Sequence, residues 1–180
     1  IDKISQPEKD EIVLNIRTFA ENYKLVLCAH SAYARVHFTN KTKKNPDSAP
    51  LFCMLLRKHL GSGKIISVRQ VDFERIIEFE IESYDELGDL TVKKLIIEIM
   101  GRHSNIILTI NDKIIDSIKH IDFTVSSVRQ VLPGLMYSYP PKQSTKSLLE
   151  IDQTLNLDIT QSGQMSAKSV LKSISGISPL

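Results

Sequence analysis

A short segment of mixed polar residues lies between two apolar runs in the middle of the chain. It reads Gly-Arg-His-Ser-Asn at positions 101–105. Arg102 and His103 offer a fixed cation and a titratable ring, while Ser104 and Asn105 add a hydroxyl and an amide. Such a set suits contacts with phosphate, sugar or backbone groups better than covalent chemistry. Serine and asparagine also commonly bond to the backbone of their own turn, so the alternative is a polar turn that stabilises itself.

Other basic residues cluster at two further places. Three lysines lie within residues 41–44, and Arg57-Lys58 comes at the end of a predicted helix. Cations near a helix C-terminus stabilise it by complementing its dipole. Arg57 and Lys58 therefore have a structural explanation as well as a possible role in binding.

Arg75 is the least expected of the basic residues. By strand alternation it falls on the same side as Ile77, Phe79 and Ile81, where an apolar face begins. An arginine there either extends to solvent at the strand end or is held by a partner such as Glu74 or a phosphate.

No pattern for an enzyme or a metal site is found in the sequence. It contains no glycine-rich phosphate loop, no closely spaced Cys and His ligands and no His-Glu-x-x-His helix. His59 falls on the apolar side of its predicted helix, which favours a structural role. The carboxylates at 85–89 flank Gly88 in a predicted surface turn, so burial that would favour acid catalysis is not expected. We expect a binding module that is not an enzyme, with no cofactor and no metal site.

Length and composition narrow the class of protein. The 180 residues suffice for one domain with a core, or for one domain and part of another, and the net charge of +2 is too small to indicate a nucleic-acid binder by itself. Cys28 and Cys53 lie in apolar runs and are expected in the core of a protein from a reducing compartment. No stretch approaches the roughly 20 apolar residues of a membrane span. These features favour a soluble, cytoplasmic protein without membrane insertion, and a chain beginning at Ile1 suggests a fragment of a larger one.

The dominant pattern along the chain is alternation with a period of two. It predicts strands at 12–17 and 24–28, joined by a hairpin, and at 77–82, 92–100, 105–110 and 113–118. In the strand at 77–82, three glutamates are expected to face away from the apolar side. The pair Asn111-Asp112 tolerates positive φ and predicts a tight hairpin. The expected fold is an antiparallel β sandwich or barrel of the α+β class.

Three segments depart from the strand pattern. A helix is predicted at 51–60, with Pro50 at its start and Gly61 after its end; its apolar residues leave a gap near Cys53 and Arg57. Pro133-Gly134 and residues 137–142 predict an extended linker leaving the β domain. Beyond it, helices are predicted at 148–157 and 166–175, so the domains are expected to be 1–141 and 142–180.

Four segments of the sequence together resemble the N-terminal domain of the NFACT family. They are Leu-Val-Leu-Cys-Ala-His-Ser-Ala-Tyr-Ala-Arg-Val-His at 25–37, Phe-Cys-Met-Leu-Leu-Arg-Lys-His-Leu at 52–60, Glu-Ile-Met-Gly-Arg-His-Ser-Asn-Ile-Ile-Leu at 98–108 and Val-Leu-Pro-Gly at 131–134. The resemblance covers residues 1–141. It implies a fold similar to the N-terminal domain of formamidopyrimidine-DNA glycosylases, followed by a helix-two-turn-helix or helix-hairpin-helix module. The glycosylase's catalytic N-terminal proline has no counterpart, so glycosylase activity is not implied.

The resemblance also implies a function. The family includes ribosome quality-control factors, which bind tRNA on an obstructed large ribosomal subunit and promote C-terminal alanine tailing of the stalled chain. An Asp-Arg pair important for that work aligns with Glu74-Arg75, where glutamate replaces aspartate. This implies an RNA-binding module in which Glu74 and Arg75 are the first candidates, and Arg57, Lys58, Arg102 and His103 are further backbone contacts to tRNA or rRNA.

Two other functions stay open at the level of sequence. Some members of the family are named as fibronectin-binding proteins, which implies an adhesin located at the cell surface. The domain could also be a structural scaffold in which every basic residue is ordinary surface charge.

Overall fold

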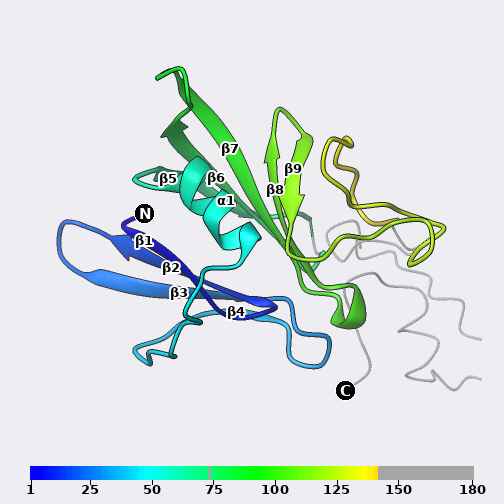
Figure 1. Ribbon diagram of the computed structural model, residues 1–180, viewed down its shortest axis with the longest axis horizontal. Coiled ribbons are helices and arrows are strands. Elements are labelled where there is room, and N and C mark those ends of the chain that lie inside the picture. The colour runs from blue at the N-terminus through cyan, green and yellow to red at the C-terminus, as the bar shows by residue number, and fades with distance from the viewer. Residues whose placement is uncertain (73, 142–180) are drawn as a thin grey trace, which may run out of the picture. The chain divides into compact units, whose positions relative to one another are not determined.

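The part of the chain that the structure describes is built from two antiparallel sheets and one α-helix (Figure 1). The computed structural model describes residues 1–72 and 74–141. Contacts divide the chain into one unit of residues 1–69 and 76–138 and a second of 70–75 and 139–180. The elements of the first unit are described below, and the helices predicted after residue 142 lie outside the described residues.

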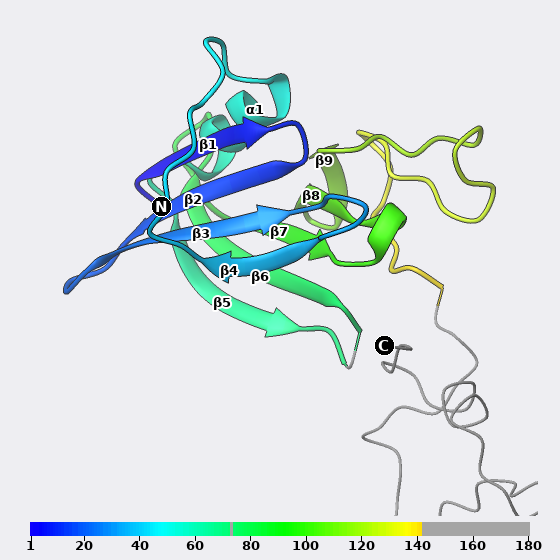
Figure 2. The ribbon, with the colours of Figure 1, turned by 90° about the horizontal axis from the view of Figure 1, so that it is seen from below.

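The first sheet is a four-stranded meander in sequence order. Its strands are β1 (Lys3–Glu8), β2 (Glu11–Arg17), β3 (Asn22–Cys28) and β4 (Arg35–Phe38). The predicted hairpin joins β2 to β3, with Leu14 opposite Leu25. Because side chains alternate between faces, Leu14, Leu25 and Leu27 pack inward while Lys24 and Val26 lie on the outer face. Figure 2 shows the four strands of this sheet side by side, in the order β1 to β4.

The second sheet is a five-stranded meander. Its strands are β5 (Lys64–Gln70), β6 (Ile76–Tyr84), β7 (Leu90–Glu98), β8 (Asn105–Ile110) and β9 (Lys113–Ser117). The predicted tight hairpin between β8 and β9 is confirmed, since Asn111 and Asp112 both have positive φ, of 51° and 60°. A 3-10 helix, Gly101–His103, joins β7 to β8.

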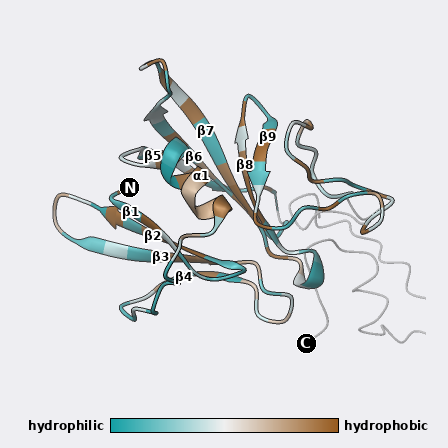
Figure 3. Cartoon of the chain, in the orientation of Figure 1, coloured by the Kyte–Doolittle hydropathy of each residue, from teal (hydrophilic) through white to brown (hydrophobic). Residues whose placement is uncertain are grey.

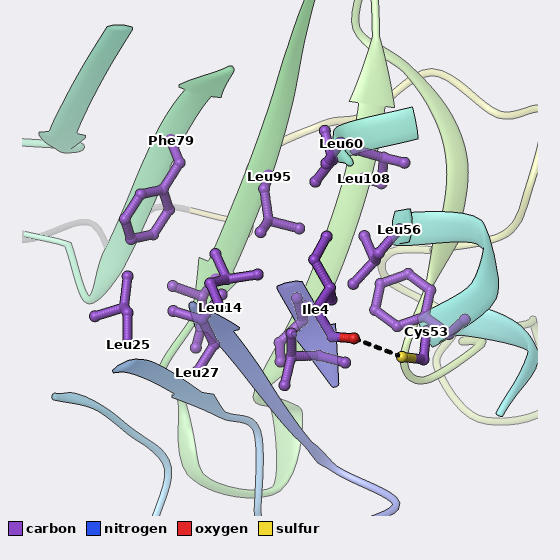
Figure 4. Packing of buried hydrophobic residues seen from close by; sticks show 14 of the residues in the cluster. Ile4, Leu14, Leu25, Leu27, Cys53, Leu56, Leu60, Phe79, Leu95 and Leu108 are labelled. Carbon is purple, nitrogen blue, oxygen red and sulfur yellow. Dashed lines mark hydrogen bonds between the residues drawn. The ribbon is translucent and has the colours of Figure 1, made fainter. Parts of the chain in front are cut away.

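The inner faces of the two sheets meet in one hydrophobic core (Figure 4). Ile4, Leu14 and Leu27 come from the first sheet, and Phe79 and Leu95 from the second. Each large apolar side chain removed from water in this way contributes roughly 1.5–3 kcal/mol. This packing fixes which residues of each strand face outward, and so positions the polar surface.

Helix α1 (Leu51–Leu60) packs against β1, β6 and β9, with the bounds that the sequence predicts. Cys53 is fully buried and does not face the predicted gap, because its thiol packs over β1 within 3.7 Å of the Ile4 carbonyl. Figure 3 shows the helix changing from apolar to hydrophilic towards its C-terminal end. Gly61 ends it through close approach rather than left-handed backbone: a Cβ there would lie 2.5 Å from the Arg57 carbonyl oxygen.

Several expectations about strands are corrected by the structure. β1, β4 and β5 were not predicted, because β1 is polar with Pro7 in it, β4 has four residues and no residue of β5 is buried. Glu78 was expected to face solvent but is 1% exposed, because Arg69 of β5 covers it and donates from Nε at 2.8 Å. A carboxylate can face an interior only when a cation accompanies it.

The predicted linker is wrong in its first half. Residues 131–137 are bound to the sheet: the amide of Gly134 donates to the Ile114 carbonyl at 2.8 Å, and the amide of Tyr137 donates to the Asp112 carbonyl at 2.7 Å. These bonds satisfy the outer edge of β9, which otherwise exposes its backbone.

A buried ion pair fixes this returning segment to the end of β7. Glu98 is 1% exposed, and Arg129 donates to its two oxygens at 2.9 and 2.7 Å. The hydroxyl of Tyr137 donates to the same carboxylate at 2.9 Å. All three groups belong to the first unit, and together they stabilise the strand end that leads into Gly101–His103.

Ser83 and Lys93 connect the other end of this sheet to the helix. The Lys93 side chain is fully buried and donates to Ser83 Oγ at 2.7 Å, and Ser83 Oγ donates to the His59 carbonyl at 2.7 Å. Burial and, to a smaller extent, the charges of Lys93 and Lys58 lower the pKa of His59.

Removing Arg129 is expected to destabilise the domain severely. The substitution Arg129→Met leaves the Glu98 carboxylate buried without its cation, which costs about 3 kcal/mol of unfolding free energy. Urea denaturation measures the loss. Arg102→Met, which removes an exposed arginine from the neighbouring turn, is the matched control and should leave the midpoint unchanged. Equal stability of the two variants would contradict this role of the ion pair.

The lowered pKa of His59 predicts a pH dependence of stability. Below the ordinary value of 6.5 the unfolded chain takes up a proton more readily than the folded one, so unfolding free energy falls as pH falls. The variant His59→Gln has no imidazole to protonate, so it lacks this contribution to the pH dependence of the unfolding free energy. Between about pH 7.5 and about pH 5.5 the variant should therefore lose less stability than the parent in urea denaturation. A parallel loss in both proteins would show that His59 does not titrate in this way.

Candidate nucleic-acid interface

The polar turn at residues 101–105 divides into two halves with different roles. Ser104 and Asn105 are buried, and Ser104 Oγ accepts a hydrogen bond from the Met100 amide at 2.9 Å. Asn105 Nδ2 donates to the Lys119 carbonyl at 2.8 Å. Arg102 and His103 are exposed, and Arg102 Nε donates to His103 Nε2 at 3.0 Å. The first pair holds the turn, and the second is available to a partner.

The turn lies beside the loop that joins β3 to β4, as Figures 1 and 2 both show. A Cβ on Gly101 would come 3.6 Å from the Ser31 carbonyl oxygen. In the same loop the rings of His30 and Tyr33 stack with centroids 3.6 Å apart, and the Arg35 guanidinium lies 5.2 Å from the Tyr33 ring. This end of the β domain therefore presents cations next to the exposed ring of Tyr33 and the half-buried ring of His30, which suits bases and phosphates of a nucleic acid.

Arg57 and Lys58 are already engaged at the end of α1. Arg57 Nε donates to the Ile4 carbonyl at 2.8 Å, which fixes the guanidinium against β1 while its side chain stays exposed. Lys58 forms an exposed ion pair with Glu86, and this contact lowers the pKa of the Glu86 carboxyl. Ion pairs this exposed contribute little to stability, so the pair does not prevent Lys58 from contacting another group.

The structure does not bring Lys58 and Arg102 together. Lys58 contacts Glu86 in the turn before β7, whereas Arg102 follows the other end of that nine-residue strand. The strand spans roughly 30 Å, so the two basic clusters cannot contact one phosphate.

Glu74 and Arg75 lie in the second unit, in the short connection between β5 and β6. The Glu74 amide donates to the Val71 carbonyl at 2.9 Å, and Gln70 Nε2 donates to the Glu74 carbonyl at 2.9 Å. Arg75 is exposed, and among the described residues no hydrogen bond or ion pair engages its side chain. The expected pairing of Glu74 with Arg75 is not seen there. Strand alternation does not apply to Arg75 either, because β6 begins at the next residue.

A groove on the outer face of the first sheet was not predicted as a site. We call it the outer groove. Its volume is about 290 Å³, and the charged residues that line it are Lys3, Glu11, Lys24, Arg35, Lys41 and Lys43. Two features of the sequence could have indicated this groove, namely the lysines at 41–44 and the outward position of Lys24. The sequence did not show that the segment after β4 runs back across the sheet.

Glu11 anchors that crossing segment. It is 3% exposed and lies 3.0 Å from Lys43 Nζ and 3.5 Å from Arg35 Nη2. The hydrogen bond to Glu11 raises the pKa of Lys43. Lys24 donates to the Thr42 hydroxyl from the other side. Residues 41–43 are thereby held over the outer face of β2 and β3.

Among the described residues no group of acidic, His and Cys side chains could hold a metal ion, and no helix is long and apolar enough to cross a membrane. Cys28 and Cys53 are both buried and carry free thiols.

Comparisons with known proteins identify related chains. A family model described as NFACT N-terminal and middle domains matches residues 1–180. The chain is 46% identical over its whole length to a protein named Rqc2 homolog RqcH from Bacillus subtilis, and 40% identical over 98% of its length to one of the same name from Streptococcus suis. It covers 32% of each, so it spans about a third of the length of these relatives.

Solved structures give a matching result. The N-terminal domain of fibronectin-binding protein PavA from Streptococcus pneumoniae superposes with a TM-score of 0.88 at 38% identity, over 99% of this chain and 67% of that one. A structure titled as a fibrinogen binding protein from Staphylococcus aureus gives a TM-score of 0.87 at 36% identity, over 100% of this chain and 64% of that one.

Proposed function

The chain belongs to the NFACT family, and we propose that it is an RNA-binding module of a ribosome quality-control factor. In this proposal the complete protein binds tRNA and the obstructed large ribosomal subunit and promotes C-terminal alanine tailing of the stalled chain. The described part supplies contacts to RNA and no catalytic group. Such work would place the protein in the cytoplasm.

The exposed guanidinium of Arg75 is the observation that carries the proposal. Its side chain has no hydrogen bond or ion pair with any described residue, although the backbone before it is held by two hydrogen bonds. An arginine fixed at its base and unengaged at its tip is suited to a bidentate contact with a phosphate. Glu74 keeps the acidic charge that the family places before this arginine.

The other candidate residues support phosphate contacts to different degrees. Arg102 and His103 are exposed beside the stacked rings of the β3–β4 loop, and they favour contact with a nucleotide. The Nε of Arg57 already donates a hydrogen bond to β1, and Lys58 forms an ion pair with Glu86. These two are proposed as weaker contacts to the RNA backbone.

Fibronectin binding is the alternative function, because a structural neighbour is titled as a fibronectin-binding protein. A surface with this many exposed cations also attracts acidic proteins without specificity, and such attraction disappears at moderate salt. The alternative therefore requires binding that survives physiological ionic strength.

Replacing Arg75 tests the RNA proposal. In the full-length protein, Arg75→Ala should weaken tRNA binding roughly tenfold, equal to about 1.4 kcal/mol, through removal of one charge-assisted hydrogen-bonded pair. The slope of log affinity against log salt should fall by about one. Fluorescence anisotropy with labelled tRNA over a salt series measures both quantities.

Lys64→Ala is the control for this experiment, since it removes one exposed positive charge from the other end of β5. It should bind tRNA as the parent does. If Arg75→Ala and Lys64→Ala bind equally well, Arg75 has no specific contact with tRNA. Alanine tailing in a cell-free reaction with stalled ribosomes then shows whether the arginine acts on a later step.

Fibronectin binding is tested separately with immobilised fibronectin. Under the RNA proposal, any binding seen at low salt should be abolished at about 0.15 M ionic strength, where exposed charges are screened beyond roughly 8 Å. Saturable binding that persists at this ionic strength would instead support the adhesin function.

A further inference from the structure

We propose that the outer groove is a second RNA site, which holds the phosphodiester backbone of a single strand. The choice of RNA as the source of the phosphates rests on the proposed function. The position of the site rests on the charge of the groove, on the spacing of its lysines and on the residues of its floor.

The groove concentrates positive charge that the rest of the chain lacks. It is lined by five lysines and arginines and one glutamate, whereas the whole chain has a net charge of only +2. The remainder of the chain is therefore slightly acidic. A local excess of this kind raises the concentration of anionic ligands at the groove, although the protein as a whole is close to neutral.

The cations of the groove fall into two groups. Arg35 and Lys43 are both held by the buried Glu11, and Lys43 also lies 3.7 Å from Glu8, so the two positive charges are largely balanced by two carboxylates. Lys3, Lys24 and Lys41 form no ion pair with any described residue. Lys24 contacts only a neutral hydroxyl, that of Thr42. The unbalanced charge of the groove thus comes from these three lysines.

The unpaired lysines are spread along the groove and do not converge on one point. Lys3 and Lys24 both pair with Asn15 of β2, from its two sides, so they lie about 10 Å apart across three strands. Lys41 belongs to the segment that crosses above them. Separated cations suit successive phosphates of a strand, whereas a single phosphate ion is held by donors that converge on it.

The floor of the groove suits the rest of a nucleotide. Val13 and Val26 face each other across β2 and β3, and His37 pairs with Val26 on β4. All three line the groove and give it an apolar patch with one aromatic ring. Sugars and bases pack on such surfaces while the lysines contact the phosphates. The volume of about 290 Å³ is close to the lower limit of pockets that hold small molecules, about 300 Å³.

The test uses two double variants of the full-length protein. Lys24→Gln with Lys41→Gln removes two groove charges but keeps the side-chain length. Lys64→Gln with Lys113→Gln removes two exposed charges elsewhere in the β domain and is the matched control. Binding of a fluorescent single-stranded RNA oligonucleotide is followed by anisotropy over a salt series, and urea denaturation checks that both variants are folded.

The groove variant should bind the oligonucleotide roughly tenfold more weakly than the parent, and its salt slope should fall by about 1.4, at about 0.7 for each phosphate that is no longer neutralised. The control should match the parent in both. If the two double variants bind alike, the groove makes no specific interaction with RNA and the proposal is overturned. Crosslinking of an oligonucleotide that contains 4-thiouridine should label peptides from residues 3–15 or 24–45, which line the groove, and labelling confined to other peptides would also overturn it.

Competition distinguishes the possible occupants. Adenosine monophosphate and inorganic phosphate should not displace the oligonucleotide when each is added at the same concentration as the oligonucleotide. Displacement by either would show that the groove holds a single anion and not a strand. A poly-glutamate peptide that competes as well as RNA would show a site for acidic protein instead. The Arg75→Ala variant should bind the oligonucleotide as the parent does, so failure of the groove and failure of the Arg75 contact give different results.

Discussion

The packing of two sheets through their inner faces is the constraint on which the rest of this domain depends. Because Leu25 and Leu27 must enter the core, Lys24 and Val26 are placed on the outside of the same strand. If β3 slipped by one residue against its neighbours, its inward-facing and outward-facing side chains would change places. The core therefore fixes which side chains lie on the outer surface. The positions of the groove lysines follow from the apolar residues beside them.

Buried carboxylates decide which cations remain available for a partner. Glu11, Glu78 and Glu98 are each at most 3% exposed, and each is accompanied by arginine. An unpaired charge in such a position would be unstable, so these arginines serve the fold first. The exposed basic residues without such a buried partner include Arg102 in its turn and Lys41 in the groove. This division explains how a chain with a net charge of only +2 can present local cationic surfaces.

The sequence predicts the parts of the fold whose residues interact locally. Alternation located β2, β3 and β6 to β9, and proline and glycine bounded α1 correctly, because these signals depend on near neighbours. The strand β5 was missed because none of its residues is buried, so that it lacks an apolar alternation. The segment 131–137 was missed because it is held by hydrogen bonds to Asp112 and Ile114 of the β8–β9 hairpin, which local signals do not reveal. The burial of Glu78 was missed together with β5, because it depends on Arg69 of that strand. The resemblance to the glycosylase domain and the helical module after residue 142 stay predictions.

The candidate site shows the same difference between local and distant contacts. The sequence offered binding and a self-stabilising turn as alternatives for residues 101–105. In the structure Ser104 and Asn105 hold the turn, whereas Arg102 and His103 are exposed. It could not show that residues 41–43 cross the sheet, because this depends on the buried Glu11, thirty-two residues away from Lys43. When several separate cations each contact a phosphate of an RNA, each contact adds to the slope of log affinity against log salt. The RNA affinity of a protein with a small net charge can therefore depend on salt concentration as strongly as that of a basic protein, provided that its cations lie where the phosphates bind.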